Sequence, residues 1–268
     1  MDKITQTQIY MLYTQYLYTT TLTFTMPLLI KTTPYMSWVS VILGSTLGLL
    51  ITYPACRLAT KRPGQTFAAY GREMFGKWLH YPLYGVMLCS SLIIASFIFR
   101  ELLDLISEVY LQETPGWAVA ILFGCVFAYA VRSGIGSLFR AAQGFFFISL
   151  IWIFVIPMFI SKEMNFSKVI ALVNHIDVGG IWNGTYLMAG HTAEMVFIIF
   201  LCPFFAEIGK TSLSWATLTS GVIILINLIS AILLFGPGVA SNLMYPELEM
   251  IRYRIFRYYV QACSRSRG

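Results

Sequence analysis

Seven long stretches of this 268-residue chain carry few or no charged side chains, and they constrain its fold more than any other feature. They are Ile4–Ile30, Thr32–Cys56, Tyr81–Phe99, Thr114–Val131, Ala141–Ser161, Val178–Ala206 and Thr211–Tyr245. Each is about long enough to cross the roughly 30 Å hydrocarbon core of a bilayer as a helix. Lipid cannot hydrogen-bond to the backbone, and unbroken apolar runs of this length favour helices over barrel strands. The sequence therefore predicts an all-α integral membrane protein.

The composition excludes several classes of protein. Charged residues make up 11% of the chain and hydrophobic residues 57%, whereas a soluble domain has about 25% charged residues. A soluble enzyme, a secreted disulfide scaffold and a disordered chain are all excluded on this ground. The net charge of +6 is interpreted as a guide to membrane orientation, and we expect no nucleic-acid partner and no cofactor.

Lysine and arginine predict the orientation. With a cytoplasmic N-terminus, nine of the 18 basic residues fall at the N-terminus or in inward loops and four in outward loops. This bias follows the positive-inside rule. The remaining five are arginines between Arg252 and Arg267, on an end that this topology places outside. The tail therefore departs from the pattern of the rest of the chain.

The sixth stretch contains the clearest candidate site, in the sequence Gly190-His191-Thr192-Ala193-Glu194. Ionisable groups inside a membrane are costly and are usually functional. His191 and Glu194 are three residues apart and share a face if the backbone is helical. Two roles fit His191 and Glu194: a substrate or proton site, or a structural pair within the helix bundle. A metal site would need more ligands at suitable spacing.

The first stretch contains a run of hydroxyl side chains before Pro27. Threonine and proline weaken a helix locally, so we expect an interruption at about residues 19–27, matching one at about 190–194. Paired interruptions in two halves indicate a transporter site, where free helix ends bind the charged ends of a zwitterion. Small hydroxyl residues that merely let two helices approach closely are the alternative. The candidate substrate-binding residues are Thr19, Thr21, Thr23, Thr25, Gly190, His191 and Glu194.

Several motifs occur together and in order along the chain. They are Lys3–Gln8, Arg57–Thr66 followed by Gly76-Lys77-Trp78, Arg100-Glu101-Leu102 before Thr114–Trp117, Ala128–Ile135 and Tyr245–Arg252. In content and order these motifs resemble the B subunit of the endospore germinant receptors, the spore germination permease family. The resemblance covers about residues 3–252.

The resemblance implies a LeuT-like fold, related to the amino acid–polyamine–organocation permeases, with ten helices in two inverted five-helix repeats. Residues 1–161 would then form the first repeat, 162–245 a partial second repeat of two helices, and 246–268 an interfacial segment and a basic tail outside the pattern. The substrate site would lie between the first and sixth helices. Glu194 matches the family's glutamate in helix six, whereas Ala193 replaces a common glycine and threonine replaces the Gly-Ser type of break in helix one.

The resemblance also implies function and partners. It indicates a multi-pass subunit of the spore inner membrane that senses nutrient amino acids in a complex with an A subunit and a lipoprotein C subunit. Because the family pattern continues for three more helices, we expect a truncated member with about seven transmembrane helices. The alternatives are a proton-coupled amino acid permease acting through Glu194 and a non-functional truncated fragment. We expect no enzymatic activity, because no nucleophile or metal set accompanies His191 and Glu194.

Overall fold

The computed structural model describes residues 4–61, 65, 67–205 and 210–265, and its described residues are helical with no strand among them. The elements are α1 (Gln6–Thr20), η1 (Thr21–Thr25), α2 (Met26–Thr32), α3 (Ser37–Lys61), α4 (Phe67–Leu105), η2 (Ile106–Tyr110), α5 (Gly116–Arg132), α6 (Ile135–Ile160), η3 (Ser161–Glu163), η4 (Phe166–Lys168), α7 (Val169–Asn174), α8 (Val178–Ala193), η5 (Glu194–Phe200), η6 (Cys202–Phe204), α9 (Lys210–Phe235), α10 (Pro237–Ala240) and α11 (Pro246–Arg265). The prediction of an all-α chain is confirmed.

Four helical segments in the described part of the chain are long and apolar enough to cross a membrane. They are Ser37–Leu58, Gly71–Tyr110, Ile135–Glu163 and Ser212–Phe235, and the apolar α5 is shorter. The first and sixth predicted stretches do not form continuous α-helices, because each changes helical type part-way along. These segments support a membrane protein, and the inverted repeat stays a prediction.

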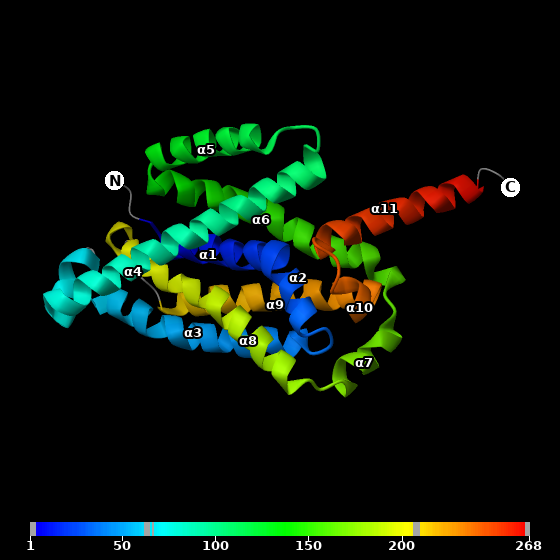
Figure 1. Ribbon diagram of the computed structural model, residues 1–268, viewed down its shortest axis with the longest axis horizontal. Helices are drawn as coiled ribbons and strands as arrows, with labels where there is room; N and C mark the ends of the chain where they lie inside the picture. The colour runs from blue at the N-terminus through cyan, green and yellow to red at the C-terminus, as the bar shows by residue number, and fades with distance from the viewer. Residues whose placement is uncertain (1–3, 62–64, 66, 206–209, 266–268) are drawn as a thin grey trace.

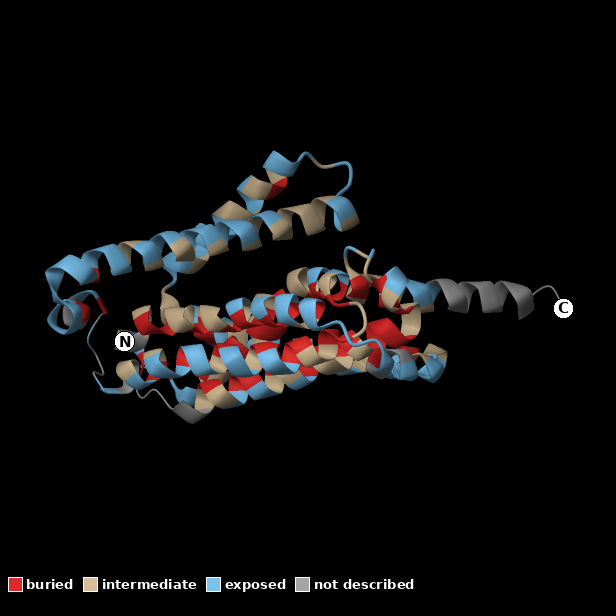
Figure 2. Cartoon of the chain, turned by 60° about the horizontal axis from the view of Figure 1, so that its bottom comes forward, coloured by how far each residue is buried: buried red, intermediate tan, exposed pale blue. Residues whose placement is uncertain are grey.

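The core lies between α1, α3, α8 and α9 (Figure 1). There α3 packs along α8, while α1 packs along α9 and α6. Apolar side chains of α9, such as Leu228, are fully buried against Leu22 and Met26 of the first segment. By contrast, α4 and α5 leave most of their large apolar side chains exposed (Figure 2), as expected of helices that face lipid or further protein.

Two glycines let α3 approach α8 closely. A Cβ atom on Gly44 would lie 2.5 Å from the Met188 Cβ, and one on Gly48 would lie 2.4 Å from the Thr192 Cβ. Gly44 and Gly48 are four residues apart, which is the small-xxx-small spacing of packed membrane helices. This contact fixes the height and rotation of α8 next to its polar end.

The start of α1 is tied to the end of the sixth segment. Thr5 caps α1 through a reciprocal capping box with Gln8. The Ile4 amide donates to the Phe204 carbonyl at 3.1 Å, and Ile4 forms a parallel bridge with Phe205. The first and sixth segments are therefore held together at this end of the molecule.

Candidate functional site

The first predicted interruption is a π-helical turn and not a pair of free helix ends. The Thr19 hydroxyl donates to the Gln15 carbonyl at 2.7 Å, and the Thr21 hydroxyl donates to the Leu17 carbonyl at 2.6 Å. Threonine that bonds to the carbonyl four residues back stays within a helix and often bends it. The backbone then widens into η1 and continues as α2, which carries Pro27 in its first turn. The expectation of free helix ends at residues 19–27 is wrong, because the threonines and the wide turn satisfy the backbone groups.

The second interruption begins later than expected. The α8 helix runs through Gly190 to Ala193, and the chain then tightens into the 3-10 helix η5, which begins at Glu194. Gly190 is therefore an exposed helical position, and a Cβ atom there would meet nothing within 4 Å. The sequence reasoning located the irregular region, but it placed its start four residues too early.

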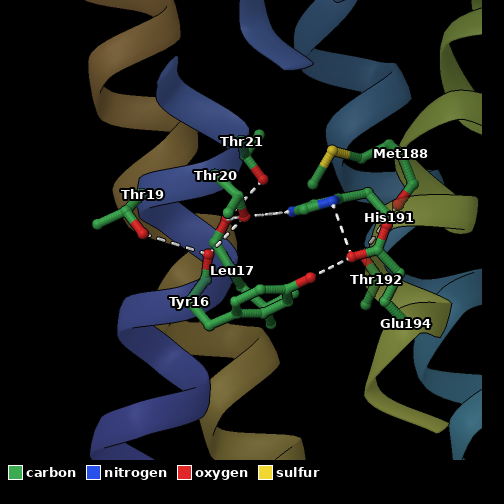
Figure 3. A network of polar contacts seen from close by, with 9 residues as sticks. All are labelled: Tyr16, Leu17, Thr19, Thr20, Thr21, Met188, His191, Thr192 and Glu194. Carbon is green, nitrogen blue, oxygen red and sulfur yellow. Dashed lines mark hydrogen bonds and ion pairs between the residues drawn. The ribbon is translucent and has the colours of Figure 1, made fainter. Parts of the chain in front are cut away.

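A polar network joins the end of α1, just before η1, to the junction of α8 and η5 (Figure 3). The Tyr16 hydroxyl of α1 donates to Oε2 of Glu194. The same oxygen lies 3.6 Å from Nδ1 of His191, whose Nε2 is 2.9 Å from the Thr20 hydroxyl oxygen. The Tyr16 and His191 rings stack with centroids 6.1 Å apart. The side chains of His191 and Glu194 are 10% and 19% exposed, so little water screens their interaction.

The Thr20 hydroxyl connects the two sides of this network. It donates to the Tyr16 carbonyl at 2.5 Å, and its oxygen lies 2.9 Å from Nε2 of His191. With the hydroxyl proton directed to the Tyr16 carbonyl, this geometry fits Nε2–H of His191 as the donor and leaves Nδ1 facing Glu194.

The four predicted threonines do not reach this network in the described structure. Thr19 lies on the side of α1 away from His191 (Figure 3). Thr21 is fully buried and bonded to its own helix. Thr23 and Thr25 are partly buried within η1. Of the predicted set, the structure thus brings together His191 and Glu194, while the hydroxyls of Thr19 and Thr21 bond to carbonyls of their own helix.

Sequence reasoning missed Tyr16 and did not select Thr20 from the hydroxyl run. The two residues are four apart on α1 and therefore share the face that meets His191. This spacing could have indicated the pair, but choosing the face requires the rotation of α1 about its axis. That rotation follows from how α1 packs on α9 and α6.

The described residues contain no group of three or more His, Cys, Asp or Glu side chains that could hold a metal ion. The side chains around the network are either apolar or have their hydroxyl bonded to a carbonyl of their own helix. Met195 is fully buried, and the Thr192 hydroxyl donates to the Met188 carbonyl at 2.9 Å. The site is a small polar cluster of an acid, an imidazole and two hydroxyls.

Residues 3–256 match the spore permease family, which is described as spore germination protein. The chain belongs to this family. Spore germination protein YndE of Bacillus subtilis (strain 168) is 23% identical over 223 residues, which cover 80% of this chain and 60% of YndE. Spore germination protein XB of Bacillus anthracis is 26% identical over 244 residues, which cover 88% of this chain and 66% of XB. The chain thus spans less than two thirds of the length of these spore permease relatives.

No solved structure matches the chain. The family resemblance predicted from the ordered motifs is confirmed.

Proposed function

We propose that the chain is a non-enzymatic membrane subunit of a spore germinant receptor and that it senses nutrient amino acids. Its membership of the spore permease family and its similarity to two spore germination proteins support this role. The observation that carries the ligand assignment is the network of Tyr16, Thr20, His191 and Glu194, which joins the end of α1 to the junction of α8 and η5.

The chemistry of the network fits an amino acid. The Glu194 carboxylate attracts an ammonium group, and His191 protonated at Nδ1 attracts a carboxylate. A ligand would insert by replacing the Tyr16 hydroxyl on Glu194, since its ammonium group provides stronger, charge-assisted hydrogen bonds. The 3-10 turn that begins at Glu194 would transmit the change along η5.

The arrangement in the cell is part of the same proposal. The fold is LeuT-like, with residues 1–161 as the first repeat and 162–245 as part of the second. The N-terminus faces the cytoplasm, and the subunit lies in the spore inner membrane with the A and C subunits. The four long apolar helices support the membrane location.

The test is binding of a panel of L-amino acids to the purified chain in lipid nanodiscs, measured by calorimetry. Thr20→Val and Glu194→Gln should each weaken binding at least tenfold, because each removes a group of the network. Thr19→Val is the matched control, since the Thr19 hydroxyl bonds only to its own helix. Equal affinity in the Thr20 and Thr19 variants would contradict the proposed site.

A proton-coupled amino acid permease is the second candidate, and the contact between Glu194 and His191 favours it because the pair can take up and release a proton. In proteoliposomes with a pH gradient, this alternative predicts amino acid uptake that Glu194→Gln abolishes. Binding without uptake would support the sensor and exclude the permease for this chain.

A further inference from the structure

A second carboxyl group is buried on another side of the first segment. Glu247 lies near the start of α11, outside the four candidate spans, and its Oε1 atom is buried without a hydrogen-bond partner in the described structure. The α11 helix packs against α6, α9 and η1. Pro246 and Met250 on either side are buried, so the start of the helix is pressed into the protein.

Among the described residues of the elements packed against α11, no cation faces this carboxyl. The η1 turn has no titratable residue, and neither has α9 between residues 212 and 235. The only charged residue of α6 is Arg140, near the end of α6 opposite the Trp152–Ile160 stretch that meets α11. Tyr18 of α1 is close enough to interact electrostatically with Glu247. The Tyr18 hydroxyl oxygen is 2.6 Å from the Ser149 hydroxyl oxygen.

The two arginines of α11 whose side chains the structure describes are engaged elsewhere. Arg252 contacts Glu249 at 2.9 Å, and Arg254 contacts Glu163 at 3.0 Å. Tyr245, which precedes the helix, lies near the acidic residues at the end of α4 and brings no positive charge. Glu247 therefore has a buried carboxyl oxygen and no counter-ion among the described side chains that surround it.

Ionising a carboxyl group whose buried oxygen has neither a cation nor a hydrogen-bond donor is costly, and the neutral acid costs much less. Burial accordingly raises the pKa of Glu247 from 4.5 to about 7. From this geometry we propose that Glu247 is a proton-binding site whose proton holds the start of α11 against η1 and α6.

The sign of the pH dependence follows from linkage. The docked state has the start of α11 packed against η1 and α6, and there the pKa of Glu247 is raised. Glu247 therefore favours docking most strongly below its undocked pKa of 4.5, and its contribution to docking falls as pH rises to about 7. The two pKa values correspond to a change in the docking equilibrium on the order of a hundredfold. Above neutral pH the ionised carboxylate draws water in and loosens the start of α11.

The experiment uses the full chain in lipid nanodiscs and has two readouts. Infrared spectroscopy follows the stretch of protonated carboxyl groups from pH 5 to 9, and hydrogen exchange of residues 246–255 is corrected for the intrinsic effect of pH. The wild-type chain should show a carboxyl band that titrates near neutral pH, with exchange that rises in parallel. Glu247→Gln should remove both, whereas the control Glu249→Gln, on the same helix and paired with Arg252, should keep both.

A carboxyl band near neutral pH that keeps its full wild-type intensity in Glu247→Gln would overturn the proposal, and so would α11 exchange that depends on pH equally in both chains. Circular dichroism confirms that the variant is folded. If it is not, Glu247→Asp serves instead, since it keeps the acid and should retain a shifted titration. Neither readout requires an amino acid ligand, so the result is independent of the proposed sensing function.

Discussion

Replacement of Gly48 by alanine tests whether the contact between α3 and α8 positions the candidate site. The new Cβ would lie 2.4 Å from the Thr192 Cβ and 3.0 Å from the Ala189 carbonyl oxygen. Ordinary van der Waals contact begins at 3.4 Å, so α8 must move by about 1 Å. The Thr192 Cβ is attached directly to the backbone and cannot rotate away. His191 is its chain neighbour, so the movement should also disturb the network.

The magnitude follows from two opposing effects. Alanine is favoured over glycine in a helix by about 1 kcal/mol, and overpacking costs about 1–3 kcal/mol. Because the clash involves the backbone and a Cβ atom, we take the upper end of the cost and expect a net loss of about 2 kcal/mol in the free energy of unfolding.

The assay is chemical unfolding of the purified chain in detergent, followed by circular dichroism. Gly124→Ala is the matched control, because Gly124 lies within α5 and a Cβ atom there meets nothing within 4 Å. The control should be as stable as the wild-type chain or more stable. If Gly48→Ala unfolds no earlier than Gly124→Ala, the packing argument is refuted.

Three further perturbations test local interactions. Thr5→Ala removes the α1 capping box and should destabilise that end by about 1 kcal/mol, seen as faster hydrogen exchange in the first turn; unchanged exchange would contradict it. Glu163→Gln removes the partly exposed ion pair with Arg254 and should cost no more than about 1 kcal/mol, measured by exchange in α11. Tyr16→Phe removes the hydrogen bond to Glu194 and should cost roughly 1.5–3 kcal/mol in detergent unfolding, a loss that a purely apolar role of Tyr16 would not produce.

The sequence was sufficient for the properties that depend on composition and local spacing. Long uncharged stretches predicted helices, since lipid leaves the backbone few other ways to satisfy its hydrogen bonds. The three-residue spacing of His191 and Glu194 predicted a shared face, and the structure brings both to one network. The ordered motifs were enough to predict the family.

The sequence was insufficient where the outcome depends on helix rotation and backbone choice. Five threonines lie between residues 19 and 25, and only the packing of α1 selects Thr20 for contact with His191. Whether threonine and proline unwind a helix or widen it into a π turn depends on which carbonyls the hydroxyls reach. The four-residue spacing of Gly44 and Gly48 is a local signal of close helix packing, but it does not identify α8 as the partner.

The two irregular segments suggest how a small ligand could act on this chain without unfolding any helix. The backbone of the first segment is already satisfied by the η1 turn, so replacing the Tyr16 hydroxyl on Glu194 would require only a side-chain movement. Glu194 is the first residue of the 3-10 helix η5, whose hydrogen-bond geometry is poorer than that of an α-helix, so the backbone can lengthen or rotate there at lower cost. Gly48 packs tightly against Thr192 on the α8 side, so η5, which leads toward the contact between Phe204 and Ile4, is the less constrained path for that change.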